Sequence, residues 1–500
     1  MFSVVSSVLT PGRAFTLGLL LIATTPTAMR GLWAQQSTSP RQHIGFISFS
    51  QASPVMHVLS AVLPDELVHT VAAADHSEWD KYVRAKDAEI RQRLRGGDLD
   101  TLANLLLFGT SYTSAEVLTP ALLSTIHADQ TDEPSRNAAS TTLLRRIDDL
   151  TTGLAHPDAN ERLRYFRDLL TNQQYRFETP SDLLRVKQFL GSNLVRMLHE
   201  DDAYASALEQ AKRMGEKGYE KRSQVFAQRG ISLDTSLFPN YALEEALREA
   251  KRRGLLPKRI SRIGVIGPGL DIVNKDEGLD YYPEQTIQPF LIADTLVRIG
   301  VADAAKLQIV TFDVSEQVNH HLANASSHAM SGRGYTVQLP IRSDIPWTEG
   351  AIAYWRRAGL AVGHSVAPKK SRAGAELRYK AVALPPALVA KVSPVDLDVI
   401  YQREELPVAE KLDLIFATNM FVYYGSFEQA LAMENIATML SASGLLLTND
   451  VLPDAQGLAL RSLAVSDTPY SSRPNDGDRI TIYGKSSQRL SAGQQQTPSR

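Results

Sequence analysis

Two short stretches in the second half of the chain combine residue types that suit ligand binding. Gly267, Pro268 and Gly269 follow an apolar run that ends at Ile266, and glycine lets the backbone approach a ligand with no Cβ in the way. Asp313 ends a second apolar run, where Rossmann-like folds place a carboxylate that accepts hydrogen bonds from ribose hydroxyls. Each feature has a structural alternative, because Gly-Pro-Gly also makes plain turns and aspartate also caps helices.

A dinucleotide is the obvious ligand to consider, and the spacing disfavours it. The dinucleotide fingerprint needs glycine or alanine at its third conserved place, where this chain has Ile272. The fingerprint also places its acidic residue about 20 residues further on, whereas Asp313 lies more than twice that distance after Gly269. The spacing therefore argues against a dinucleotide site.

Composition excludes several other chemistries. The chain has no cysteine, so disulfides, thiolate metal sites and cysteine nucleophiles are ruled out. Adjacent His320 and His321 would point about 100° apart on a helix, and no metal-ligand spacing is present, so we expect no metal site. The 53 basic and 55 acidic residues are well mixed, and we therefore expect no nucleic-acid partner.

Short apolar runs alternate with helical segments after Asn240, a predicted helix cap, and this rhythm is typical of a parallel sheet. Ser315 is predicted to cap the helix after the second run, and Ser426 with Gln429 to form a capping box later in the chain. The predicted strands are Arg262–Ile266, Leu307–Phe312, Leu397–Tyr401, Leu412–Ala417 and Leu445–Thr448, followed by an antiparallel pair at Leu463–Val465 and Arg479–Tyr483.

The chain as a whole is predicted to be an α/β protein of two domains. Residues 53–235 have apolar positions at helical spacing and form a predicted all-α domain, and residues 240–485 form a Rossmann-like domain, mostly parallel with a terminal antiparallel strand. Residues 331–393 are an insertion, either a substrate-facing lid or a segment packed on its own small core. Residues 35–52 are a predicted linker, and residues 486–500 a disordered tail.

The first 34 residues suit a signal peptide or an anchor. Arg13 precedes an apolar run from Ala14 to Ala23, and Leu32–Ala34 offers a small-residue cleavage site. The run is short for a span, which takes about 20 apolar residues, so no membrane span is expected after cleavage. The protein would then be exported or periplasmic, whereas a true start at Met29 would make it cytoplasmic.

The order of parts in the C-terminal half resembles class I S-adenosylmethionine-dependent methyltransferases, and most closely the chemotaxis receptor glutamate methyltransferases (the CheR-type group). The similarity rests on the glycine loop, on Asp313-Val314-Ser315, on Gly334-Tyr335 followed by Tyr354-Trp355, and on Pro394–Leu397. It rests above all on the run Leu412–Tyr424, which is similar to an apolar fourth strand that ends in Arg-Asn, apolar residues and Tyr-Phe.

This resemblance implies S-adenosyl-L-methionine as the cofactor and a role for each matching residue. Gly267 and Gly269 would contact its amino-acid part and Asp313 its ribose, whereas Asp396 with Leu397 would contact its adenine. Thr418 and Asn419 would line the sulfonium pocket, and Tyr423 would face the methyl acceptor, which makes Asn419 and Tyr423 the expected catalytic residues. Three positions depart from the family: Thr418 stands in place of arginine, Asp396 in place of asparagine, and Ser441–Gly444 lacks Pro-Gly-Gly.

The predicted function is therefore methyl transfer from S-adenosylmethionine to an unidentified acceptor, a small molecule or a protein side chain. No catalytic triad is required, because the methyl carbon is already activated by positive sulfur and the protein mainly orients the reactants. The alternative is a catalytically inactive, methyltransferase-like exported protein with a binding or structural task.

Overall fold

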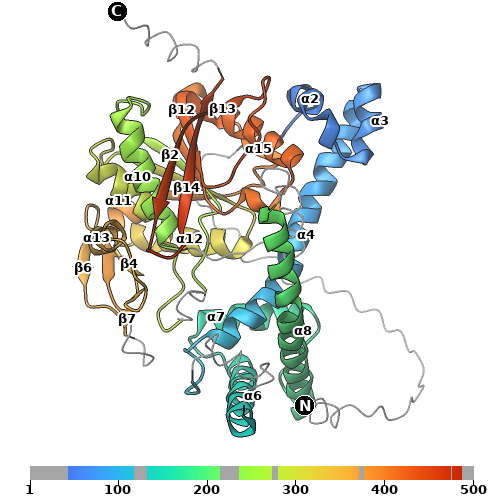
Figure 1. Ribbon diagram of the computed structural model, residues 1–500, viewed down its shortest axis with the longest axis vertical. Coiled ribbons are helices and arrows are strands. Elements are labelled where there is room, and N and C mark those ends of the chain that lie inside the picture. The colour runs from blue at the N-terminus through green and yellow to red at the C-terminus, as the bar shows by residue number, and fades with distance from the viewer. Residues whose placement is uncertain are drawn as a thin grey trace, which may run out of the picture. The chain divides into compact units, whose positions relative to one another are not determined.

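The computed structural model describes residues 43–116, 132–213, 236–272, 280–370, 377–474 and 476–486 (Figure 1). The predicted signal peptide or anchor lies outside these residues, and so does the predicted tail beyond Ser486. Within the described ranges, no helix is both long enough and apolar enough to cross a bilayer.

The described residues between Phe49 and Arg213 are mostly helical. Three of these helices start after a capping polar residue; Asp75, for example, accepts hydrogen bonds from the backbone N–H groups of Ser77 and Glu78. The elements are β1 (Ile44–Phe46), α2 (Phe49–Val58), η2 (Ser60–Val62), α3 (Asp65–Ala73), α4 (His76–Phe108), α6 (Glu133–Ala155), α7 (Glu161–Asn172) and α8 (Pro180–Arg213).

A seven-stranded sheet forms the centre of the C-terminal half, in the order β13-β14-β12-β11-β2-β3-β9. Five neighbouring strands are parallel, and β14 pairs antiparallel with both β12 and β13. The strands are β2 (Arg262–Ile266), β3 (Gln308–Asp313), β9 (Val392–Asp396), β11 (Leu412–Ala417), β12 (Leu440–Thr448), β13 (Leu460–Pro469) and β14 (Gly477–Lys485). This mixed, mostly parallel sheet with helices agrees with the predicted Rossmann-like α/β architecture.

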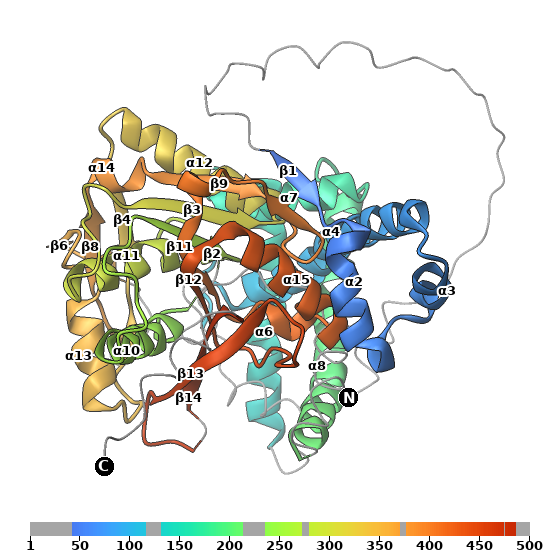
Figure 2. The ribbon, with the colours of Figure 1, turned by 90° about the horizontal axis from the view of Figure 1, so that it is seen from above.

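The two faces of the sheet belong to two hydrophobic cores. Successive side chains of a strand point to opposite faces, so Leu414 and Phe416 of β11 join one core while Ile415 and Ala417 join the other. The first face packs against α10 (Phe238–Arg252), α11 (Gln288–Arg298) and α12 (Glu316–Met330). The second packs against α15 (Ser426–Met439), beside which α2 lies (Figure 2).

The N-terminal helices complete both cores. Residues 397–411 hold only β10 (Gln402–Glu404) and η4 (Val408–Glu410), and residues 449–459 hold no helix, so the second face needs cover from elsewhere. Buried residues of α2 and α4 supply it, and β1 pairs antiparallel with β10. Buried residues of α6, α7 and α8 join the core of the first face. A separate all-α domain is therefore not confirmed: the described residues from His43 onward belong to one compact unit by their internal contacts.

Most predicted strands agree with the structure. The first and the fourth have the predicted bounds, the second is displaced by one residue, the fifth lies inside β12, and the terminal runs lie inside the antiparallel pair. The third prediction, Leu397–Tyr401, is wrong, because the strand is β9, which ends at Asp396. Pro394 is tolerated there because β9 is the edge strand of the sheet, and Leu397–Tyr401 is apolar because it packs in the second core.

Two predicted helix caps are also wrong. Asn240 lies inside α10, which already starts at Phe238, and its Nδ2 donates to the Ser236 carbonyl over 3.0 Å. The N-cap of α15 is Gly425, whose N–H donates to Glu428 over 3.0 Å, while Gln429 is buried. The cap at Ser315 is confirmed, since its side chain accepts from the Val318 N–H.

The insertion 331–393 folds into small sheets and short helices before β9 begins. Strands β4, β8 and β6 form one sheet and β5 pairs with β7. Tyr354 and Trp355 of α13 are buried in the first core, which the insertion shares with the sheet, so these aromatic residues do not pack on a small core of their own. The elements are β4 (Tyr335–Gln338), β5 (Ile341–Arg342), α13 (Glu349–Arg357), β6 (His364–Val366), β7 (Leu377–Arg378), β8 (Ala381–Leu384) and α14 (Pro386–Val389).

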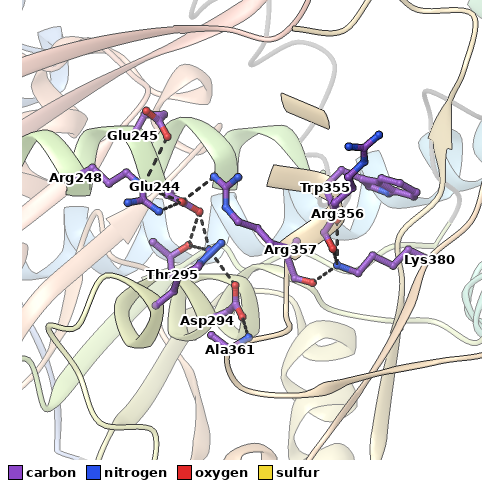
Figure 3. A network of polar contacts seen from close by, with 12 residues as sticks. Glu244, Glu245, Arg248, Asp294, Thr295, Trp355, Arg356, Arg357, Ala361 and Lys380 are labelled. Atoms are coloured by element: carbon purple, nitrogen blue, oxygen red, sulfur yellow. Dashed lines mark hydrogen bonds and ion pairs between the residues drawn. The ribbon is translucent and has the colours of Figure 1, made fainter. Parts of the chain in front are cut away.

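A buried carboxylate fixes this insertion to the helices of the first face (Figure 3). Glu244 of α10 is fully buried and pairs with Arg357 of α13 over 2.9 Å. It also pairs with Arg298 of α11 and with Arg248 of its own helix, each over 2.7 Å. One acidic side chain thus links three helices.

Candidate functional site

The chain order of the parallel strands reverses between β2 and β11. From β2 the chain continues outward through β3 to β9 on one side, and then returns to build β11 and β12 on the other side. Open α/β sheets bind ligands outside the carboxyl ends of the strands at such a switch point. The residues that directly follow β2 and β11 are therefore the first candidates for a binding site.

The glycine loop follows β2 at this point. Gly267 and Gly269 have φ values of +60° and +70°, in the left-handed region that glycine enters without a Cβ penalty. The Gly267 N–H donates to the Phe312 carbonyl over 2.9 Å, and the Gly269 carbonyl accepts from the Thr286 hydroxyl over 2.9 Å. The loop is thus fixed against the end of β3.

Asp313 ends β3, beside this loop. Its Oδ1 accepts from the Ser315 N–H over 2.8 Å, so it makes a local turn while Ser315 caps α12. Burial raises the pKa of Asp313 to about 7, the neighbouring Asp396 adds to the rise, and backbone N–H groups oppose it. Its carboxylate is thus partly desolvated and is held by backbone donors rather than by a cation of the described chain.

Asp396 ends β9, the next strand outward, and Leu397 follows it. Asp396 is the register partner of Asp313, and its half-exposed carboxylate pairs with Arg91 of α4 over 2.6 Å. Leu397 is buried and its N–H donates to the Asp313 carbonyl over 3.1 Å. The ends of β3 and β9 are therefore joined through Asp313.

Thr418 and Asn419 follow β11 on the other side of the switch point. The Thr418 hydroxyl accepts from Gln288 Nε2 over 2.7 Å, which connects it to the start of α11. Asn419 is a non-glycine residue with a φ of +57°, a conformation that is uncommon and is often found at functional sites. Its N–H and its side chain exchange hydrogen bonds with the Asn449 side chain, each over 2.7 Å.

Tyr423 lies in the short helix η5 (Phe421–Tyr423), just before α15. The start of this helix is held by Asp450, whose Oδ2 accepts from the Phe421 N–H over 2.8 Å. Tyr423 is partly exposed, whereas the neighbouring Tyr424 is buried. The guanidinium of Arg93 on α4 lies over the Tyr424 ring, 5.5 Å from its centroid.

The predicted site residues thus lie at the carboxyl ends of four neighbouring strands of the sheet. Gly267 and Gly269 follow β2, Asp313 ends β3, Asp396 and Leu397 follow or end β9, and Thr418 to Tyr423 follow β11. The edge offers backbone groups, carboxylates and amides as hydrogen-bond partners, together with an apolar surround. In the described ranges no group of three or more histidine, aspartate or glutamate side chains could hold a metal ion.

Several residues at this edge were not found from the sequence. Asn449 and Asp450 come directly after the apolar run of β12, so their place at a strand end was a usable signal. Arg162 of α7 gave no such signal, although it donates to the Tyr282 carbonyl over 2.6 Å and to the Ile272 carbonyl beside the glycine loop. Its distance in the chain from the loop conceals this contact.

No protein-family model matches this chain, and no curated protein matches it. The solved structures to which the chain shows similarity include a TehB-like SAM-dependent methyltransferase from Corynebacterium glutamicum, with 10% identity, 54% of this chain and 97% of that chain covered, and a TM-score of 0.22. Another is magnesium protoporphyrin IX methyltransferase from Synechocystis with bound SAM, with 7% identity, 49% and 80% covered, and a TM-score of 0.22. Likenesses at such low TM-scores carry no weight for the assignment, which depends on the geometry described above.

Proposed function

We propose that this protein binds S-adenosylmethionine at the carboxyl edge of the sheet and transfers its methyl group to an acceptor. The observation that carries the proposal is the switch point between β2 and β11, with the left-handed glycine loop on one side and Thr418 and Asn419 on the other. Asp313, at the end of the adjacent β3, supplies a carboxylate where a ribose would be bound.

The residues present fit this cofactor. Backbone groups at Gly267 and Gly269 would bind its amino-acid part, and Asp313 would accept hydrogen bonds from its ribose hydroxyls. Leu397 is buried beside Asp313 and would form an apolar wall for adenine. The carboxylate of Asp396 pairs with Arg91, so its expected role at adenine would be shared with that pair.

The cofactor would supply a methyl carbon made electrophilic by its positive sulfur. This methyl group would be available to an electron-pair donor of the acceptor, and S-adenosylhomocysteine would remain in the site. Thr418 and Asn419 would hold the sulfonium end, and Tyr423 would face the acceptor. The chain contributes orientation and a partly desolvated pocket rather than a covalent intermediate.

The finer assignments depend on the sequence alone. The resemblance to the chemotaxis receptor glutamate methyltransferases would imply a carboxylate acceptor, and Thr418 removes the arginine that could pair with one. We therefore propose the methyl acceptor only as a small molecule or a protein side chain. The described residues provide no observation in favour of an inactive exported protein.

Calorimetric titration with S-adenosylmethionine and S-adenosylhomocysteine tests the proposal. Wild-type protein should bind both, and Asp313→Ala should bind about 10- to 100-fold more weakly, as expected for the loss of hydrogen bonds to a charged group. Asp467→Ala is the matched control, because Asp467 is an exposed aspartate on β13 at the far edge of the sheet. No heat from the wild-type protein at high ligand concentration would contradict the proposal.

A further inference from the structure

Helix α4, from the N-terminal part of the chain, reaches the carboxyl edge of the sheet. Arg91 Nη1 lies 2.6 Å from Oδ1 of Asp396, the last residue of β9. Two residues further on, the Arg93 guanidinium lies over the ring of Tyr424, just before α15. The same helix therefore contacts segments on both sides of Asp313.

Arg91 is fixed at this position by three side chains. Besides Asp396, its Nε donates to Asp87 on the same helix over 3.0 Å, and its Nη2 donates to Gln402 of β10 over 3.4 Å. Its side chain is about four-fifths buried, with a relative exposure of 21%. A guanidinium held in this way presents a charge at a defined place, because its planar fork is already oriented.

The partner of Arg91 is the immediate neighbour of the proposed ribose carboxylate. Asp396 and Asp313 are register partners on adjacent parallel strands, so two acidic side chains end side by side. The charge of Asp396 opposes the ionisation of Asp313, and a cation paired with Asp396 offsets that charge. Arg91 is the cation that pairs with Asp396.

We propose that Arg91 is a positioning residue for the cofactor site: by pairing with Asp396, it offsets the charge beside Asp313 and so favours the carboxylate form that accepts hydrogen bonds from ribose hydroxyls. The inference rests on the proposed function and deepens it, because it makes an N-terminal helix part of the cofactor site. Arg91 touches neither ligand nor reacting atoms in this proposal, and acts through Asp396.

The groups that face Asp313 come from four elements. They are Asp396 on β9, the backbone N–H groups of Val314 and Ser315 on its own loop, and the buried phenol of Tyr424 before α15. Arg91 on α4 reaches it through Asp396. Burial raises the pKa of Asp313 to about 7, so its carboxylate form, and with it ligand affinity, should increase as pH rises through that value.

The test is the affinity for S-adenosylhomocysteine as a function of pH, measured by calorimetry on the full chain. In Arg91→Ala, Asp396 loses its cation, so the midpoint of the pH profile should move upward by about one unit and affinity near neutral pH should fall up to about tenfold. Arg91→Lys keeps the charge without the planar fork. Its pH midpoint and its affinity should lie between those of wild type and those of Arg91→Ala.

Arg95→Ala is the matched control. Arg95 lies on the same helix and pairs with Glu316 over 3.3 Å, but both side chains are mostly exposed. Removing an exposed pair of this kind has little effect, so the pH profile of Arg95→Ala should coincide with that of wild type.

Asp396→Asn gives an independent measurement if Arg91→Ala fails to fold. Removing the like charge should move the midpoint downward, and adding Arg91→Ala to Asp396→Asn should then move it no further. Binding by wild type with an unchanged midpoint in both Arg91→Ala and Asp396→Asn would overturn this inference alone. Absence of binding by wild type would overturn the proposed function, and this inference with it.

Discussion

Two glycines have nearly the same backbone conformation, but only one lies in the candidate site. Substituting each of them distinguishes the local cost in stability from an effect on ligand binding. Gly267 in the glycine loop has a φ of +60°, and Gly254 after α10 has a φ of +69°. A Cβ at Gly254 would meet nothing within 4 Å, and one at Gly267 would make only ordinary contact with Met420, at 3.7 Å. The difference between the two positions is therefore their place in the fold, not their strain.

We expect Gly267→Ala and Gly254→Ala each to cost about 1 kcal/mol of unfolding free energy, because a Cβ disfavours the left-handed region. Only Gly267→Ala should also weaken S-adenosylmethionine binding. The loop would shift to relieve the strain, and its backbone groups would then no longer be oriented toward the ligand. Urea unfolding and calorimetric titration of both variants check this. Equal affinity in the two variants would count against the assigned loop.

The candidate site residues could be predicted where they lie next to a readable strand. Gly267 and Asp313 each follow an apolar run, and the run fixes which edge of the sheet they occupy. Arg91 and Arg162 could not be predicted, because their contacts cross long stretches of chain and leave no local periodicity. The left-handed conformation of Asn419 was equally hidden, since it depends on its exchange with Asn449.

At the scale of elements, burial on both faces decided which strands could be recognised. β2 and β11 are central strands with nearly continuous apolar sequences, and their bounds follow directly from those runs. β9 was misplaced because it is an edge strand containing Pro394, while the apolar run that follows it is covered by the N-terminal helices. Strand prediction by apolar runs therefore fails where distant helices bury a loop.

Glu244 links the helices α10, α11 and α13 through its ion pairs, so its substitution tests how these elements are held together (Figure 3). Glu244→Ala leaves its arginine partners without their shared anion. Loss of one partner of a buried ion pair costs about 3–5 kcal/mol, and partial exposure of these arginines reduces the expected cost to about 2 kcal/mol.

The adjacent Glu245 supplies the control for this prediction. It lies 3.9 Å from Arg248 and is itself 39% exposed, so Glu245→Ala should change the unfolding free energy by less than about 0.5 kcal/mol. Urea unfolding of both variants gives the comparison. Similar losses in the two variants would show that Glu244 does not hold the insertion.

At the scale of the whole molecule, the shared cores predict that helices and sheet unfold together. Trp79 of α4 is fully buried in the core of the second sheet face, and its Nε1 donates to the Ile47 carbonyl over 2.8 Å. Thermal unfolding followed by circular dichroism and by tryptophan fluorescence should therefore give one coincident transition. Two separate transitions would indicate that the N-terminal helices unfold as an independent domain.

Trp79→Ala should lower the stability of that single transition by about 3–5 kcal/mol, the usual cost of removing a large buried side chain. Leu184 on α8 is half exposed, and Leu184→Ala is the matched truncation, with an expected cost of less than about 1 kcal/mol. A loss confined to part of the transition in Trp79→Ala would contradict the shared core.

Buried carboxyl groups predict how stability depends on pH. Burial raises the pKa of Glu284, Asp313 and Asp398 to about 7, from ordinary values of 4.5 or 3.8. Between those limits the folded chain holds more protons than the unfolded chain, so stability is highest below the ordinary values and falls as pH rises through 7. His321 opposes this trend, because burial lowers its pKa from 6.5 to about 4.

Three raised carboxyl groups outweigh one lowered imidazole, so the urea midpoint should be lower at about pH 8 than at about pH 5. Glu284→Gln removes one of the three from a buried site and should flatten the dependence. Glu316→Gln, at an exposed position on α12, should leave the dependence as it is in wild type. A urea midpoint that rises between the two pH values would mean that these carboxyl groups are hydrated or paired in solution, and that the carboxyl edge of the sheet is more open than its burial indicates.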